Sequence, residues 1–241
     1  MDLSRLAVLC DFDGTACLED VGHRLFQRFA GEASREAVAR WMRGELNTRQ
    51  CLVLECAAVQ AGREELLAYV GEARLDPTFA RLVALSRAVP FPLLVVSEGL
   101  DFYIRHILER HGLGDVPFEA NQAVFGDEAS LADEASAGPG PGRLGVRFAR
   151  GESGCASCGN CKGFHVRRFR GAGRTVVFAG DGLSDRCGAR EADLTFAREG
   201  RDLARWCAAE GIPHLVFARL GEVAERLESA RWESLVEEAR R

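Results

Sequence analysis

Three short apolar runs, each followed by polar or glycine residues, predict the buried strands of the core. They cover residues 6–10, 91–96 and 175–179. Continuous apolar runs of this length are typical of strands that are buried on both faces of a parallel sheet. Shorter candidates at residues 194–196 and 215–217 are each followed by a helical pattern. Because strands alternate with helices, the pattern indicates a parallel sheet.

Helical spacing replaces the strand pattern between residues 19 and 74. Apolar residues recur there three or four positions apart, and glycines at positions 31, 44, 62 and 71 separate the helical stretches. About four short helices are therefore expected directly after the first strand.

Further helices and one hairpin are predicted in the rest of the chain. Residues 118–125 and 144–148 are expected to pair around a loop at residues 137–142 that is rich in glycine and proline. The expected helices run from Asp76-Pro77 to about residue 88, over residues 100–110, from Lys162 onwards, and through Leu220, Val223 and Leu227.

Composition narrows the function classes. With 241 residues, of which 47% are hydrophobic, the chain can bury a large core. Its 31 basic and 36 acidic residues give a net charge of -5, without the basic surplus of a dedicated nucleic-acid binder. The longest apolar stretch, residues 89–96, is too short to span a bilayer. A small-molecule partner is expected, rather than nucleic acid or a membrane.

Two features of the sequence indicate the cellular compartment. The chain opens with the acidic residue Asp2, and Asp11 and Asp13 interrupt the apolar run that follows, so no signal peptide is expected. Nine cysteines are an odd number, which favours reduced thiols or metal ligands over a disulfide framework. We therefore expect a soluble cytoplasmic protein.

Polar residues follow the three main strand candidates. Asp11, Ser97 and Asp181 lie at these ends, and in parallel sheets ligands bind beyond the carboxyl ends of the strands. We therefore expect these residues to line one crevice. Taken alone, residues 11–15 and 180–185 could each form only a turn or a helix cap. A calcium loop does not fit, because the alternating ligands and distal glutamate are missing.

The order of the motifs favours one family. Asp-x-Asp-Gly-Thr begins at Asp11, Ser97 follows an apolar strand, Lys162 opens a helix, and Gly-Asp-x-x-x-Asp ends at Asp185. This set resembles the four motifs of the haloacid dehalogenase superfamily and spans nearly the whole chain. The helical insertion resembles the cap of its phosphoserine-phosphatase-like branch. The resemblance implies an α/β fold: a Rossmann-like parallel sheet flanked by helices, with a core of residues 1–18 and 75–241 and a helical cap of residues 19–74.

The resemblance implies hydrolysis of a phosphate ester. Asp11 holds the position of the nucleophile, which forms an aspartyl-phosphate. Asp13 holds the position of the acid that protonates the leaving alkoxide and later takes a proton from water. The superfamily's dehalogenases lack this second acid. Thr15 and Ser97 would donate hydrogen bonds to phosphoryl oxygens, and Lys162 would supply a positive charge.

Several carboxylates in one site also imply a cation. Mg²⁺ is held by a few carboxylates, waters and the substrate phosphate. By resemblance, Asp11 and Asp181 are direct ligands, Asp13 contributes its backbone carbonyl, and Asp185 orients a metal-bound water or Lys162. Lys162 is the only lysine of the chain, and its place in the motif weakens the alternative of a solvated surface residue.

Three cysteines come directly before Lys162. Cys155, Cys158 and Cys161 have the spacing of zinc ligands, and His165 or Cys187 could complete such a site. Three thiols alone are incomplete, so a reduced loop without metal is the alternative.

Other details concern the substrate. Residues 158–163 and 195–198 resemble the methionine-salvage phosphatases that act on 2-hydroxy-3-keto-5-methylthiopentenyl-1-phosphate. Asp20 matches an acid that contacts the substrate in phosphoserine phosphatases, although it could equally be a helix N-terminal residue. Phosphoethanolamine and phosphocholine phosphatases also have cysteines before the motif lysine. In the family pattern the motif serine is followed by two glycines, whereas here Ser97 is followed by Glu98 and Gly99. The sequence therefore does not decide whether the backbone of this segment contacts the phosphate, or whether Glu98 reflects a different substrate.

Two other classes are compatible with the motifs. A phosphotransferase or mutase would use the same aspartyl-phosphate with a different acceptor. A metal-binding scaffold that has lost catalysis is the second alternative, and the intact Asp13 and Lys162 argue against it.

Overall fold

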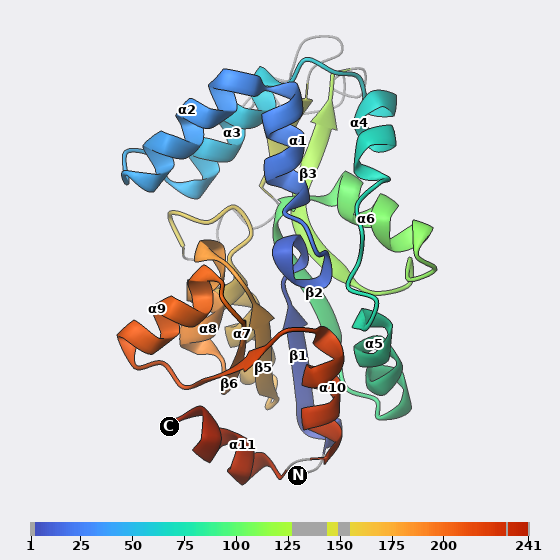
Figure 1. Ribbon diagram of the computed structural model, residues 1–241, viewed down its shortest axis with the longest axis vertical. Coiled ribbons are helices and arrows are strands. Elements are labelled where there is room, and N and C mark those ends of the chain that lie inside the picture. Colours follow the sequence, from blue (N-terminus) through green and yellow to red (C-terminus); the bar gives the residue numbers. More distant parts are fainter. Residues whose placement is uncertain (1–2, 127–143, 149–154, 230, 241) are drawn as a thin grey trace.

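One seven-stranded sheet organises the protein in the computed structural model, which describes residues 3–126, 144–148, 155–229 and 231–240 (Figure 1). The strand order is β4-β3-β2-β1-β5-β6-β7. All pairs are parallel except β3 (Phe118–Phe125) with β4 (Leu144–Arg147). The other strands are β1 (Leu6–Cys10), β2 (Leu93–Leu100), β5 (Thr175–Gly180), β6 (Leu194–Arg198) and β7 (His214–Phe217).

β1 lies at the centre of the sheet and is buried along its whole length. Its Leu9 is paired with Leu94 of β2 on one side and with Phe178 of β5 on the other. From β1 the chain builds one half of the sheet and then crosses to β5 to build the other half. The carboxyl end of β1 is therefore the point at which the strand order reverses, where open α/β sheets bind their ligands. The predicted α/β fold with a mainly parallel sheet is confirmed.

Helices cover both faces of the sheet. Leu6, Val8 and Cys10 of β1 face one apolar cluster, and Ala7 and Leu9 face the other. The first cluster includes residues of α5 (Phe79–Ala88), α6 (Asp101–Arg110), α10 (Leu220–Ser229) and α11 (Trp232–Ala239). The second includes residues of α7 (Lys162–Gly171), α8 (Arg186–Glu191) and α9 (Asp202–Glu210). No helix in the described ranges is long and apolar enough to cross a lipid bilayer.

Four helices lie within residues 19–74, beyond the carboxyl end of β1 (Figure 1). They are α1 (Val21–Phe29), α2 (Gly31–Met42), α3 (Thr48–Ala58) and α4 (Arg63–Val70). Asn47 caps α3 by accepting a hydrogen bond from the Gln50 backbone N–H at its Oδ1, and Gln50 Oε1 accepts one from the Asn47 backbone N–H. The expected number of helices is correct. Their behaviour as a separate cap domain stays a prediction.

Several element boundaries differ from the expected ones. The helix expected from Asp76 begins at Phe79, because Asp76 Oδ1 instead accepts hydrogen bonds from the Thr78 backbone and hydroxyl. Strand β2 continues to Leu100, with a register shift against β3 between Val96 and Leu100. Helices α8 and α11 were not predicted. The 118–125 and 144–148 hairpin is confirmed, and its predicted loop at 137–142 lies outside the described residues.

Candidate active site

The loop after β1 carries the first motif. Asp11 follows Cys10 directly and is 3% exposed. Gly14 has a φ of +75°, which disfavours a residue with a side chain. A Cβ at Gly14 would also lie 2.3 Å from Asp181 Oδ2. Glycine thus lets the loop turn tightly and lets Asp181, from the loop after β5, approach Asp11.

Lys162 joins two of the expected site residues, Asp11 and Asp185, and also contacts Ser184. Its Nζ lies 2.5 Å from Asp11 Oδ1, 2.5 Å from Asp185 Oδ1 and 3.2 Å from the Ser184 hydroxyl. The side chain is 1% exposed, so it is not a solvated surface lysine. Burial alone would lower the pKa of this ammonium, but the Asp11 and Asp185 carboxylates outweigh burial and raise the pKa. Lys162 therefore stays charged.

The carboxylates around Lys162 are crowded. Burial raises the pKa of Asp11 well above its usual value, Asp185 adds to the shift, and Lys162 opposes it. Burial also raises the pKa of Asp181 to about 7, again with a contribution from Asp185. Asp185 Oδ2 accepts hydrogen bonds from the backbone N–H groups of Asp181 and Gly182, both 2.8 Å away. These bonds hold the loop after β5 in place.

Asp11, Asp181 and Asp185 fit a hard divalent cation. Carboxylate oxygens of the three residues all lie within 4.8 Å of one another. One lysine leaves this group with an excess of negative charge, and a cation would relieve the repulsion that adds to the effect of burial in raising the pKa values of Asp11 and Asp181. Oxygen ligands of this kind suit Mg²⁺.

The Asp13 side chain binds the start of α1. Its Oδ1 accepts hydrogen bonds from the backbone N–H groups of Val21 at 3.0 Å and Gly22 at 3.3 Å. Its Oδ2 accepts from the Tyr103 hydroxyl at 2.8 Å and the Ser97 hydroxyl at 3.2 Å. Asp13 is thus oriented by both the core and the first inserted helix.

Burial raises the pKa of Asp13 to about 6, and the nearby Asp20 carboxylate adds to the shift. The hydrogen bonds from Tyr103, Gly22 and Ser97 act in the opposite direction. A carboxyl group with a pKa near 6 can both donate and accept a proton at neutral pH.

Gly99 makes room for Tyr103. A Cβ at position 99 would lie 1.7 Å from the Tyr103 hydroxyl oxygen, so any larger residue would displace the phenol from Asp13. The Gly99 N–H donates to the Ser97 hydroxyl at 2.9 Å. The Thr15 hydroxyl is 3.5 Å from Asp181 Oδ1.

Glu98 binds the loop that precedes Lys162. Its Oε2 accepts hydrogen bonds from the backbone N–H groups of Gly159 at 2.9 Å and Asn160 at 3.2 Å. Burial raises the pKa of Glu98, and these hydrogen bonds oppose the shift. The Asn160 amide also donates to the carbonyl oxygens of Ser97 and Glu119. Glu98 therefore has a structural partner within the protein, which the sequence did not reveal.

A cavity of about 420 Å³ lies between the motif residues and the inserted helices. Its polar side includes Asp11, Asp13, Ser97, Glu98, Gly99 and Asp181. Its opposite side is formed by a set of apolar residues of α1, α2 and α3, here called the apolar wall: Phe26, Val38, Trp41, Met42 and Leu52.

Two further acids of the inserted helices line the cavity. Asp20 is the N-cap of α1, where its Oδ1 accepts a hydrogen bond from the His23 backbone at 2.8 Å. It also borders the cavity, so the two interpretations of this residue are compatible. Glu55 of α3 is 8% exposed and accepts a hydrogen bond from the Ser34 hydroxyl at 2.7 Å. Burial raises the pKa of Glu55 to about 7.

Sequence reasoning missed Tyr103, Glu55 and Ser184 as members of the site. Tyr103 lies at a buried position of α6, where the pattern alone predicts packing, and Glu55 of α3 is a charged residue, for which the pattern predicts a solvated position. Ser184 lies between Asp181 and Asp185, which was the one available signal.

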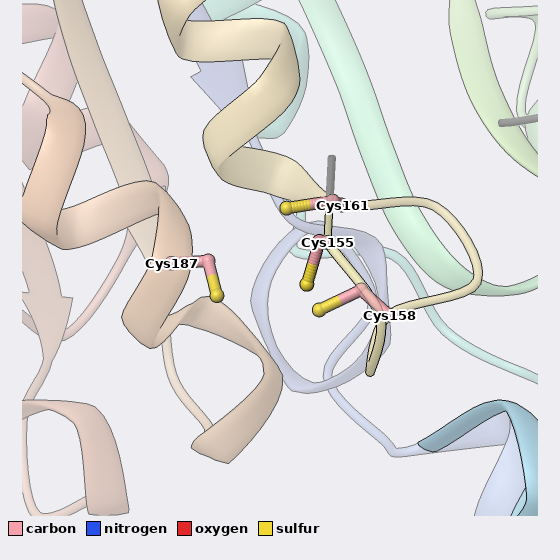
Figure 2. A group of neighbouring side chains, drawn as sticks. All are labelled: Cys155, Cys158, Cys161 and Cys187. Carbon is pink, nitrogen blue, oxygen red and sulfur yellow. The ribbon is translucent and has the colours of Figure 1, made fainter. Parts of the chain in front are cut away.

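The loop directly before Lys162, which carries three of the cysteines, lies next to α8. Figure 2 shows Cys155, Cys158 and Cys161 with their sulfur atoms turned towards Cys187. His165, the other suggested ligand, instead places its Nε2 2.7 Å from Asn160 Oδ1.

Comparison with known proteins places the chain in a family. The sequence profile of the haloacid dehalogenase-like hydrolases matches residues 8–190, and the chain belongs to this family. The family predicted from the four motifs is therefore confirmed.

Individual relatives agree with this placement. The 2-hydroxy-3-keto-5-methylthiopentenyl-1-phosphate phosphatase of Brevibacillus brevis is 26% identical over 95% of this chain and 98% of its own. A HAD family hydrolase from Salmonella enterica serovar Typhi has a TM-score of 0.71 at 15% identity, over 95% of this chain and 72% of that chain. A phosphoserine phosphatase solved as a phospho-aspartyl intermediate analogue has a TM-score of 0.65 at 19% identity, over 95% and 100%. The structural likenesses show a shared fold.

Proposed function

We propose that the protein is a magnesium-dependent phosphatase that hydrolyses a small phosphomonoester through an aspartyl-phosphate on Asp11. The observation that carries this proposal is that Asp11 and Asp13 line one cavity, that Lys162 joins Asp11 to Asp185 behind it, and that the pKa of Asp13 is raised. The curated relatives named as phosphatases support the same class of reaction.

In the first step, an Asp11 carboxylate oxygen attacks the phosphorus atom and the bond to the leaving alkoxide breaks. Lys162 holds Asp11 in place and offers positive charge to the transferring group. Ser97 and Thr15 have hydroxyl groups beside Asp13 and Asp181, from which they can turn to donate to phosphoryl oxygens.

Asp13 acts as the general acid and then as the general base. In its protonated form it donates to the leaving alkoxide, and the resulting carboxylate then takes a proton from the water that attacks the aspartyl-phosphate. Its pKa of about 6 suits both tasks near neutral pH. Tyr103, Ser97 and the N-terminus of α1 fix the orientation of its carboxyl group.

Asp11, Asp181 and Asp185 are the side chains that would hold or orient Mg²⁺, with the Asp13 backbone carbonyl as a further ligand. When bound, the ion neutralises negative charge and polarises the phosphoryl group. We expect phosphate release to stop in excess EDTA and to return when Mg²⁺ is added. Activity that survives complete removal of divalent metal would contradict this part of the proposal.

The apolar wall favours a substrate with an apolar end. We propose the methionine-salvage enol-phosphate as the first candidate, because its methylthio group would pack against Trp41 and Leu52. Burying a group of this size contributes about 1.5 kcal/mol, or roughly tenfold in kcat/KM. Phosphoserine is the second candidate, because Asp20 and Glu55 border the same cavity and could receive its amine. Helices α1–α4 would act as the cap that closes over either substrate.

A substrate panel tests the proposal. Phosphate release from the enol-phosphate, phosphoserine, phosphoethanolamine and phosphocholine is ranked by kcat/KM. Leu52→Ala should lower kcat/KM for the enol-phosphate by about tenfold and leave the polar substrates less affected. Leu54→Ala is the matched control, because Leu54 lies on the same helix but is 41% exposed. A flat profile would contradict any narrow substrate assignment.

The same assay addresses phosphotransfer. If an added alcohol acceptor receives the phosphoryl group faster than water does, the protein is a phosphotransferase. Phosphate release that is unaffected by acceptors supports hydrolysis.

A further inference from the structure

Four cysteines from two separate segments form one compact group of sulfur atoms, here called the cysteine cluster. Cys155, Cys158 and Cys161 belong to the loop before α7, and Cys187 belongs to α8 (Figure 2). All four sulfur atoms lie within 4.8 Å of one another. All nine cysteines lie within the described residues, and each is a free thiol there.

The dimensions of the cysteine cluster suit one tetrahedral metal ion. A Zn–S bond of about 2.3 Å places neighbouring sulfur atoms of a tetrahedron roughly 3.8 Å apart. Sulfur atoms that already lie within 4.8 Å need to move by about one ångström or less to reach this geometry. A cubane iron–sulfur cluster needs more room, because each thiolate binds a different iron atom.

We propose that Cys155, Cys158, Cys161 and Cys187 bind one zinc ion in a closed structural site. Four thiolates fill the coordination sphere of zinc and leave no position for substrate or water, which distinguishes this site from a catalytic one. Cys161 is also the N-cap residue of α7, where the helix dipole favours a thiolate. The site is chemically distinct from the carboxylate group, whose oxygen ligands suit magnesium.

The position of the cysteine cluster indicates what the metal would fix. Cys161 directly precedes Lys162, and Cys187 lies two residues after Asp185, so zinc would cross-link the segments that carry this buried ion pair. Glu98 already holds the same loop through the backbone of Gly159.

The inserted helices contact this loop as well. Arg49 of α3 donates from Nε to the Cys158 carbonyl oxygen at 2.6 Å and from its guanidinium to the Cys155 carbonyl oxygen at 3.3 Å. The Asn47 amide lies 3.5 Å from the Ala156 carbonyl oxygen. A zinc ion that orders this loop would therefore also order a docking surface for α3.

Metal analysis of the full-length protein tests the proposal without any activity assay. Protein purified under reducing conditions from zinc-supplemented medium should contain one zinc ion per chain by mass spectrometry. Cys187→Ser should lose most of this zinc, and Cys207→Ala should keep it. Cys207 is the matched control because it is a buried free thiol on α9, outside the cysteine cluster.

Two measurements on the wild-type chain do not depend on the folding of a variant. Titration with a thiol-specific mercurial should release one zinc ion per chain. Protein reconstituted with Co²⁺ should show the intense visible absorption of a tetrahedral thiolate site, and it should do so whether or not the protein hydrolyses phosphate esters.

Three results would overturn the zinc site. They are a wild-type protein without stoichiometric zinc, a Cys187→Ser variant that keeps its full zinc content, and iron in place of zinc. A disulfide within the cysteine cluster of anaerobically purified protein would equally contradict it.

Discussion

Glu55 offers a test of the buried charge at the cavity. It lies on α3, is 8% exposed, and accepts a hydrogen bond from the Ser34 hydroxyl. Burial raises its pKa from 4.5 to about 7. The substitution Glu55→Gln keeps the size and an acceptor oxygen for Ser34 but cannot ionise. The difference in the free energy of unfolding between the wild type and this variant therefore isolates the destabilisation caused by ionising Glu55.

The sign and size of the effect follow from the two pKa values. Because the pKa of Glu55 is raised in the folded protein, its contribution to stability is fully present below about pH 4.5 and is lost as the pH rises through about 7. A rise of about 2.5 pKa units corresponds to about 3 kcal/mol. Between about pH 5 and about pH 8, the free energy of unfolding of the wild type should fall by roughly 2.5 kcal/mol more than that of Glu55→Gln.

Urea unfolding at several pH values, followed by tryptophan fluorescence in metal-free buffer, measures this difference. Other titrating groups are shared by the two proteins and cancel. Glu72→Gln is the matched control. Because Glu72 is exposed, the free energy of unfolding of this variant should change with pH as it does in the wild type. If the free energy of unfolding of Glu55→Gln also changes with pH in parallel with the wild type, the Glu55 carboxyl is not desolvated and its pKa is not raised.

Three further predictions concern the residues around Asp11. Tyr103→Phe removes the donor that lies 2.8 Å from Asp13 Oδ2, and kcat should fall about tenfold, with the free energy of unfolding reduced by only about 1 kcal/mol; an unchanged kcat would show that Tyr103 does not orient Asp13. Lys162→Met leaves two buried carboxylates without their partner, so phosphate release should be lost and metal-free stability should fall by about 3 to 5 kcal/mol in urea unfolding. An amine-directed reagent should modify Lys162 only after denaturation, because its side chain is 1% exposed; rapid labelling of the native protein, located by peptide mapping, would contradict the buried ion pair.

The sequence predicted those features that depend on local pattern. Apolar runs located the strands, and their carboxyl ends predicted that Asp11, Ser97 and Asp181 would meet. The spacing of apolar residues also predicted the four inserted helices. These predictions succeeded because strand burial and the ends of parallel strands are set by short segments of chain.

The sequence did not predict features that depend on contacts between distant segments. The sequence pattern predicts Tyr103 only as a core residue of an amphipathic helix. The fold shows that its hydroxyl lies beside Gly99 and donates to Asp13. Glu98 departs from the family pattern, and only the fold shows that its partner is the backbone of residues 159–160. The sequence offered His165 and Cys187 as alternative fourth members of the cysteine cluster, and only the packing of α8 against α7 decides for Cys187.

The most direct test of the central claim is to trap the phosphorylated enzyme. The protein is mixed with substrate and Mg²⁺, quenched in acid during turnover, and treated with borohydride, which reduces an aspartyl-phosphate to homoserine. Peptide mass spectrometry should then find homoserine at position 11 in wild type and no such conversion in Asp11→Asn. Rapid phosphate release with an unmodified Asp11, or full activity in Asp11→Asn, would contradict the account.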